Sequence, residues 1–254
     1  GKYSEAAPLY RRAAAINEAV LGPEHPRVAT DLYNRASLSE SQGKYAEAGP
    51  LYERCQATKE KVLGPEHPSL ASSLNNWAAL LIAQGEYAEA KPVLERAIAI
   101  RERALGLDHP NTITSRAWMA DLYTKQGFLE KASPLLDEVV SARERVLGRD
   151  HPDVASALNS RAGLLKKQGK YTEAQPLFER ALAISEGALG VDHPNTIKSR
   201  AWMADLYTKQ GFLEKASPLL EQVVSARERV LGRDHPDVAS ALNTRAGLLE
   251  SQVR

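Results

Sequence analysis

The sequence has few of the residues that most often carry chemistry. Its 254 residues include a single cysteine, Cys55, so an internal disulfide is excluded. One cysteine is typical of proteins kept in a reducing compartment, and we therefore expect a cytoplasmic location. No apolar run approaches the roughly 20 residues that a membrane-spanning helix needs, so we expect no membrane association.

The chain also lacks an excess of charge of either sign. It has 33 lysines and arginines against 32 acidic residues, which gives a formal net charge of +1. Proteins that bind nucleic acids need a concentrated basic face, because much of their affinity comes from contacts to phosphates. We therefore expect no nucleic-acid partner.

No histidine is left over for catalysis. The six histidines all occupy the same place in a repeated motif: His25, His67, His109, His151, His193 and His235. Helix packing would space them about 10 Å apart, whereas zinc ligands must lie within about 2.1 Å of one metal. A structural role in a loop is the prediction. Cys55 takes the place of Ala97, Val139, Ala181 and Val223, which predicts a small core residue. We expect no metal site, no cofactor and no enzymatic activity.

What the chain does contain is a strict period of 42 residues. Copies of one unit begin at Gly1, Gly43, Gly85, Gly127, Gly169 and Gly211. Self-similarity at a fixed period is typical of a solenoid, in which each unit buries its apolar face against its neighbours. The prediction is a single repeat array over 1–254, divided into 1–42, 43–84, 85–126, 127–168, 169–210 and 211–254.

Each unit reads as a helical hairpin. Apolar residues fall at i, i+3, i+4 and i+7 over 48–55 and again over 74–81, which is typical of two amphipathic helices. Between them, Gly64 suits the left-handed conformation that ends a helix, and Pro68 suits the first turn of the next. A further proline recurs just inside the helix that opens each copy, where its missing N–H costs little: Pro8, Pro50, Pro92, Pro134, Pro176 and Pro218.

Two motifs identify the type of repeat. Ala48-x3-Tyr52, Ala90-x3-Leu94 and Ala174-x3-Phe178 resemble the A-x3-F element of tetratricopeptide repeats. Leu74-x2-Trp77-Ala78-x2-Leu81 and Arg116-x2-Met119-Ala120-x2-Tyr123 resemble their W-x2-L-G-x2-Y element. With LNN before the small residue, QGKYxEA between helices and LGxDHP after them, the repeats resemble the kinesin light chain type. That resemblance implies an all-α, right-handed superhelical solenoid of antiparallel helix pairs.

The array begins and ends within a hairpin. Residues 2 to about 20 form a lone helix of the proline-containing type, five helix pairs follow, and 236–254 form a lone helix of the other type. Exposed apolar ends would favour end-to-end stacking of molecules. The chain lacks an initiator methionine and opens in mid-repeat, so we expect it to come from a longer protein.

A second period of 84 residues lies over the first. Residues 108–165 and 192–249 differ at only four positions: Thr114/Lys198, Asp137/Glu221, Glu138/Gln222 and Ser160/Thr244. A recent duplication and deliberate construction would both produce this pattern.

Five arginines stand where other copies carry Leu74 or Trp77: Arg35, Arg116, Arg161, Arg200 and Arg245. A ladder of polar contacts between helices is the favoured interpretation, because an arginine can bury its stem and pair with a glutamate. The rival hypothesis is that some guanidinium groups reach the binding groove and hold a ligand carboxylate.

The resemblance also implies a binding surface. In tetratricopeptide arrays the first helix of each pair lines a concave groove, and in this sequence that helix is the type that contains 74–81. The candidate groove residues are Asn34, Asn75, Asn76, Asn159, Asn243, Trp118, Trp202, Asp121, Asp205, Lys125, Lys167 and Lys209. The asparagines would hold a peptide backbone, as a carboxamide both donates and accepts. The tryptophans are either binding anchors or packed against the next repeat. The mildly basic middle repeats favour a weakly acidic peptide.

The predicted function is a scaffold that binds an extended peptide in this groove. Two alternatives remain open at this point. One is a sensing or regulatory array within a larger protein, such as one fused to an NB-ARC-type switch ATPase. The other is a module that assembles end to end.

Overall fold

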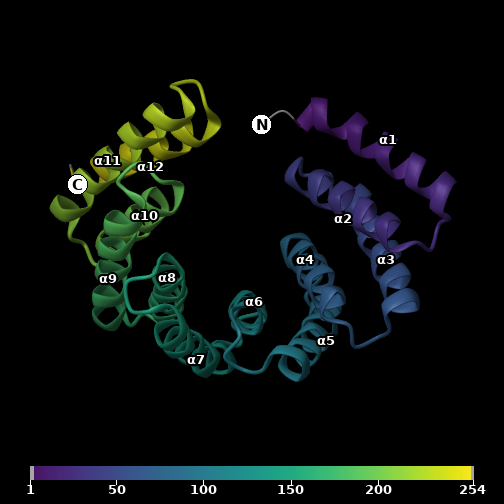
Figure 1. The fold of residues 1–254 in the computed structure, drawn as a ribbon. Coiled ribbons are helices and arrows are strands. Elements are labelled where there is room, and N and C mark those ends of the chain that lie inside the picture. The colour runs from purple at the N-terminus through teal and green to yellow at the C-terminus, as the bar shows by residue number, and fades with distance from the viewer. Residues whose placement is uncertain (1–2, 253–254) are drawn as a thin grey trace. The chain divides into compact units, whose positions relative to one another are not determined.

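The structure, a computed structural model, describes residues 3–252, and all regular secondary structure within that range is α-helical (Figure 1). The helices are α1 (Tyr3–Leu21), α2 (Pro26–Ser41), α3 (Tyr45–Leu63), α4 (Pro68–Gln84), α5 (Tyr87–Leu105), α6 (Pro110–Lys125), α7 (Leu129–Leu147), α8 (Pro152–Lys167), α9 (Tyr171–Leu189), α10 (Pro194–Lys209), α11 (Leu213–Leu231) and α12 (Pro236–Gln252). The predicted all-α hairpin repeat is confirmed.

The helices are of two alternating types. We call α2, α4, α6, α8, α10 and α12 the A helices; each begins with the proline of a His-Pro pair. The odd-numbered helices are the B helices, and each is 19 residues long with one internal proline. The lone B helix α1 and the lone A helix α12 confirm the prediction for the two ends. Residues 253 and 254 lie outside the described part.

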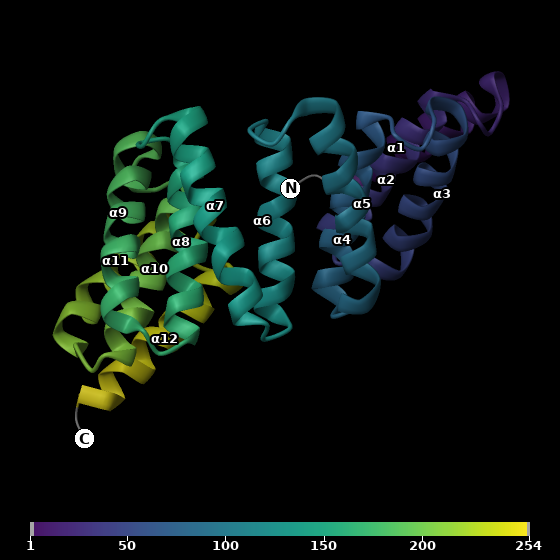
Figure 2. The same ribbon diagram turned by 90° about the horizontal axis from the view of Figure 1, so that it is seen from below.

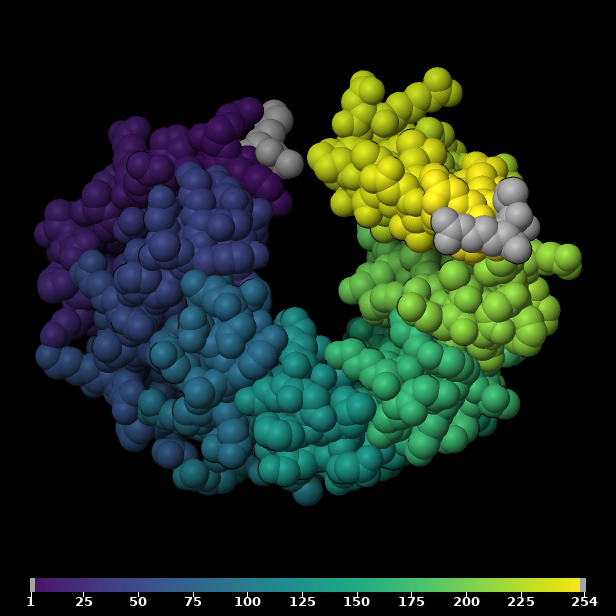
Figure 3. Space-filling model, turned by 180° about the vertical axis from the view of Figure 1, so that it is seen from behind, coloured from purple at the N-terminus to yellow at the C-terminus, as the bar shows by residue number. Residues whose placement is uncertain are grey.

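The chain forms two compact units, Gly1–Gly127 and Phe128–Arg254. The first contains α1 to α6 and the second α7 to α12. Within each unit, B helices pack on the A helices that come before and after them in the chain. Figure 2 shows α7, α8 and α9 lying side by side in the second unit, and Figure 3 shows successive repeats of each unit following one another in chain order. Each unit is thus a short stack of antiparallel helix pairs.

A histidine caps the N-terminus of each A helix, directly before the proline. The ring Nδ1 of His67 accepts a hydrogen bond from the backbone N–H of Ser69 at 3.2 Å, which satisfies one donor that the helix leaves unpaired. The other five histidines make the same contact with Arg27, Asn111, Asp153, Asn195 and Asp237. The predicted structural role of the histidines is confirmed, and so is the place of Pro68 in the first turn.

Glycine ends the helices in two different ways. Gly85 has φ 84° and ψ 6°, which is the left-handed conformation expected of a helix end. Gly64 has φ 88° but ψ 160°, so the prediction of a left-handed helical cap is wrong for its ψ angle. This region of backbone space is essentially restricted to glycine. It turns the chain from a B helix into an extended entry to the next A helix.

Small residues allow the helices to approach closely. Ala162, Ala174 and Ala204 are fully buried, and Phe178 of α9 fills the space among them in the second unit. In the first unit Cys55 is fully buried beside Val28, Ala29 and Leu32, which confirms its predicted core role. Burial raises the pKa of the Cys55 thiol because a thiolate is poorly solvated there.

Candidate functional site

The predicted groove residues fall on one face of the A helices. On α6, Trp118, Asp121 and Lys125 are spaced i, i+3 and i+7, so they lie along one side of the helix. Trp202 and Lys209 begin and end the equivalent row on α10. We call this face the open stripe; its candidate residues are Asn34, Asn76, Trp118, Asp121, Lys125, Lys167, Trp202, Asp205 and Lys209. The three lysines are exposed, and the other members are half-buried.

A second set of candidates lies at the contact between neighbouring A helices. Asn75 is 4% exposed and Asn159 is 5% exposed. The Oδ1 atom of Asn75 accepts a hydrogen bond from the Ser115 hydroxyl at 3.1 Å, which joins α4 to α6. Asn159 donates to the Ser199 hydroxyl at 2.7 Å and joins α8 to α10. These carboxamides hold A helices together in this structure, and their role as peptide clamps stays a prediction. Asn243 is exposed on α12.

A buried arginine extends the Asn75 contact. Arg101 of α5 is 5% exposed and donates to the Ser115 hydroxyl and to the Asn111 carbonyl, both at 2.7 Å. Burial lowers the pKa of Arg101, since a guanidinium loses hydration there. Ser115 therefore accepts from Arg101 and donates to Asn75. Arg101 was not predicted as a site residue, although a basic residue recurs at this place in Lys59, Arg143 and Arg227.

Two tyrosines support the open stripe of the first unit. Asn76 of α4 donates to the Tyr33 hydroxyl of α2 at 2.5 Å. The Tyr33 ring meets the edge of Tyr52 at 6.1 Å between centroids, and the Tyr52 hydroxyl donates to Glu40 at 2.8 Å. Burial raises the pKa of both hydroxyls, and the Glu40 carboxylate adds to this at Tyr52. One carboxamide of the stripe is thereby fixed in place.

Trp202 combines packing with partial exposure. Its ring lies 6.5 Å from that of Phe178 on α9, measured between centroids, and contacts the core of the second unit. The Lys198 ammonium lies 4.6 Å from the Trp202 ring centroid, in the geometry of a cation–π contact. Trp202 is therefore anchored on a preceding B helix, while part of its ring stays accessible. Trp118 is half-buried in the first unit.

The charges of the open stripe are partly paired. Lys166 of α8 forms an ion pair with Asp205 of α10, which adds a second contact between these A helices. Lys125 lies 3.9 Å from Asp121 on the same helix. Lys167 and Lys209 are both exposed, so the second unit presents cations on the face that the stripe occupies.

The arginines that replace apolar residues belong to a ladder of ion pairs. Every B helix carries a glutamate at one equivalent position: Glu18, Glu60, Glu102, Glu144, Glu186 and Glu228. Three of these pair with an arginine of the next B helix, as Arg54–Glu18, Arg96–Glu60 and Arg180–Glu144. Glu102 and Glu186 instead pair with Arg116 and Arg200 of the next A helix.

The two sources of arginine replace one another. The B helices that lack the ladder arginine carry Glu138 and Gln222 in its place, and these follow Arg116 and Arg200 in the chain. Two further A-helix arginines pair with B-helix acids, as Arg161–Asp137 at 2.7 Å and Arg245–Glu221 at 3.3 Å. The predicted ladder is confirmed for these four arginines. Arg35 is half-buried on α2.

Metal-binding clusters and membrane-spanning helices are both absent from the described residues. Within 3–252, no group of three or more His, Cys, Asp or Glu side chains is placed to hold a metal ion. In the same range, no helix is long and apolar enough to cross a membrane.

Comparison with protein families decides what the repeats are. A family model described as tetratricopeptide repeat matches residues 1–61, 31–103, 69–123, 114–186 and 153–201, and a second of the same description matches 196–237. The chain belongs to the tetratricopeptide repeat family. No curated protein shows significant sequence similarity to it.

Solved structures refine this assignment. The nearly identical repeats of a putative kinesin light chain from Podosopora anserina are 30% identical, with a TM-score of 0.67 over 81% of this chain and 97% of that one. BtubC (BKLC) of P. vanneervenii is 21% identical, with a TM-score of 0.67 over 92% and 91%. NprR in complex with its cognate peptide NprX is 16% identical, with a TM-score of 0.69 over 94% and 70%. The predicted resemblance to repeats of the kinesin light chain type is confirmed.

Proposed function

We propose that this tetratricopeptide repeat protein binds an extended peptide segment of a partner along the open stripe of its A helices. The observation that carries the proposal is the arrangement of α8 and α10. These helices contact each other, and Trp202, Asp205, Lys167 and Lys209 lie on the face they share. A polar row with a partly exposed aromatic ring suits a ligand that is read at several points along its length.

The fold likeness to NprR supports the class of ligand. That protein was solved with a cognate peptide, and its similarity to this chain lies in the fold. Lys167 and Lys209 are exposed cations, so an acidic peptide is the expected partner. Within the first unit, Asn34 and Asn76 give that unit's own part of the stripe carboxamides that suit a peptide backbone, because each offers both a donor and an acceptor.

The test is a display selection followed by measured affinities. Peptides selected against the whole chain are labelled and titrated by fluorescence anisotropy against the wild type and against Lys167→Glu and Lys209→Glu. Each charge reversal is expected to cost about 1 kcal/mol with an acidic peptide, which corresponds to roughly fivefold weaker binding. The loss should shrink at high salt, because exposed charges are screened.

A matched variant separates the open stripe from general charge effects. Lys215→Glu reverses an exposed lysine on the B helix α11 of the same unit. It should leave the affinity unchanged. Equal losses from Lys215→Glu and Lys209→Glu, or no enriched peptide at all, would refute binding along the open stripe.

A second candidate function, stacking of copies end to end, is favoured by exposed apolar residues on α1 and α12. Tyr10 and Ile16 of α1 are exposed, although their equivalents Tyr52 and Ile100 are buried. Leu249 of α12 is exposed, although its equivalent Leu165 is buried. The exposed apolar face of α12 in one copy could therefore pack on the exposed apolar face of α1 in another copy. Light scattering across a range of concentrations tests this, and a constant mass would eliminate it.

A further inference from the structure

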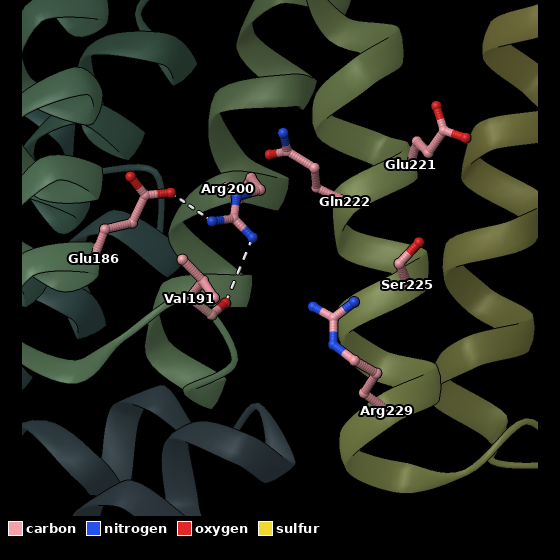
Figure 4. A pocket seen from close by; sticks show the side chains of 7 residues that line it. All are labelled: Glu186, Val191, Arg200, Glu221, Gln222, Ser225 and Arg229. Carbon is pink, nitrogen blue, oxygen red and sulfur yellow. Dashed lines mark hydrogen bonds and ion pairs between the residues drawn. The ribbon is translucent and has the colours of Figure 1, made fainter.

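A pocket opens in the second unit away from the open stripe. It has a volume of about 480 Å³ and lies between α9 and α11, with Arg200 of α10 as its most buried lining residue (Figure 4). Residues of an α-helix advance by about 100° each, so Trp202 and Lys209 point roughly opposite to Arg200. A ligand in this pocket would leave the open stripe free.

The pocket follows from one exchange in the ion-pair ladder. Arg180 spans from α9 to Glu144 on the preceding B helix, and Arg96 and Arg54 do the same in the first unit. The equivalent residue of α11 is Gln222, which is shorter and uncharged. Glu186 pairs instead with Arg200 of the A helix α10. The space that a ladder arginine would fill between α9 and α11 therefore stays open.

Hydrogen-bond donors converge on this space. Figure 4 shows the guanidinium groups of Arg200 and Arg229 facing it from α10 and α11, with Gln222 and Ser225 beside them. Arg200 is 4% exposed; it donates to Glu186 and, at 3.5 Å, to the Val191 carbonyl. Its buried Nε–H has no acceptor among the described residues. A buried donor without an acceptor is unfavourable, so Arg200 has unused hydrogen-bonding capacity beside the pocket.

The acidic residues near the pocket are already paired at its edges. Glu186 accepts from Arg200, and Asp192 accepts from Arg229 at 2.5 Å. Glu221 forms an ion pair with Arg245 and has a largely exposed side chain. Each cation of the lining thus has one carboxylate, so the lining is close to neutral. A doubly charged phosphate would meet three nearby carboxylates, whereas a carboxylate carries a single charge and a planar shape that fits a guanidinium fork.

We propose that this pocket binds a carboxylate group, held by Arg229 and Ser225 at its mouth and by Arg200 beneath them. Such a group can come from a free small carboxylate or from an aspartate or glutamate side chain of a peptide. Both sources share the chemistry that the pocket recognises, and they differ in what must fit around the carboxylate.

The experiment is a titration of the whole chain with sodium succinate and, separately, with the peptide Gly-Gly-Glu-Gly-Gly. Binding is monitored by calorimetry and by the arginine Nε–H signals in NMR. Sodium chloride at equal ionic strength is the reference. Arg229→Gln removes a donor, and Gln222→Arg fills the pocket as Arg180 does at its equivalent position. Each is expected to weaken saturable binding by at least about tenfold, the loss of one charge-assisted hydrogen bond.

Arg103→Gln is the matched control. Arg103 is equivalent to Arg229 and pairs with Glu66 as Arg229 pairs with Asp192, but it lies outside the pocket. Circular dichroism checks that the variants stay folded. Binding of both probes, or of one alone, that is lost in Arg229→Gln and Gln222→Arg but kept in Arg103→Gln supports the proposal and identifies the source. No saturable binding, or equal binding by all variants, overturns it and leaves the peptide proposal for the open stripe untouched.

Discussion

The ion-pair ladder predicts that equivalent glutamates differ in their contribution to stability. Glu60 and Glu186 occupy the same place in two B helices, so replacing either with alanine changes helix propensity equally. Their arginines differ in burial. Arg96, the partner of Glu60, has a side chain 38% exposed, whereas that of Arg200, the partner of Glu186, is 5% exposed. The perturbation is therefore Glu186→Ala compared with Glu60→Ala.

The magnitudes follow from what each change leaves behind. Glu60→Ala leaves Arg96 in contact with water, and exposed ion pairs contribute about 0.2–1 kcal/mol. Glu186→Ala leaves a buried guanidinium whose remaining acceptor is the Val191 carbonyl at 3.5 Å. Removing one partner of a buried pair costs about 3–5 kcal/mol. Because Glu186 is itself 38% exposed, water can reach part of the vacated site, and we expect about 3 kcal/mol.

The assay has to report on one region at a time, because long repeat arrays need not unfold in a single step. Native-state hydrogen exchange measures the free energy of local opening in α10 for Glu186→Ala and in α4 for Glu60→Ala. Urea midpoints of the whole chain provide a second readout. We expect protection in α10 to fall by at least about 2 kcal/mol more than protection in α4.

One further variant isolates the cause. Leucine occupies the place of Arg200 in other A helices, where Leu32, Leu74 and Leu158 are fully buried. Arg200→Leu combined with Glu186→Ala removes the stranded cation, so it should recover most of the lost stability. Equal costs for the two glutamates, or no recovery in the double variant, would refute the reasoning from burial.

Three further predictions concern single groups. The raised pKa of Tyr52 means that the folded state favours the neutral hydroxyl. The contribution of Tyr52 to the free energy of unfolding is therefore complete below the pKa of tyrosine in the unfolded chain, about 10, and is lost as pH rises above that value. Tyr52→Phe should reduce the fall in the urea midpoint between about pH 9 and 11. His109→Ala removes the acceptor for the Asn111 N–H and should cost about 1 kcal/mol by thermal melting, whereas His109→Asn should recover most of it. Buried Cys55, with its raised pKa, should resist a maleimide reagent in the native chain and react fully in urea, as mass spectrometry would show.

The fold was open to prediction because its signals are local and repeated. The histidine cap at His67 and the helix start at Pro68 depend on a few neighbouring residues, and both recur in every copy. Alanine at places such as Ala174 is required wherever two helices approach closely. The extended ψ of Gly64 was missed because a glycine indicates that φ is positive but carries no information about ψ.

The site was harder to predict because it depends on the angle between neighbouring helices. Asn75 and Asn76 are adjacent in the chain, and periodicity places both away from the core. In the structure Asn75 meets Ser115 on the next A helix, while Asn76 meets Tyr33 on the previous one. A rotation of 100° per residue separates these directions, but only the packing of α2, α4 and α6 determines which of them is covered.

The arginine ladder indicates how variation enters an otherwise strict repeat. Each paired glutamate of the ladder needs one cation, and the cation can reach it from the next B helix or from the A helix between them. Where the arginine comes from the B helix, as Arg180 does, its side chain fills the space between the two B helices. The A helix between them then carries a buried apolar residue, Leu158, in place of an arginine. Where the arginine comes from the A helix, as Arg200 does, the next B helix no longer needs one. The shorter Gln222 then stands at that position and leaves the pocket open. Two compensating substitutions therefore keep the stack intact while adding a polar cavity, which is how a repeat can gain a site without losing its fold.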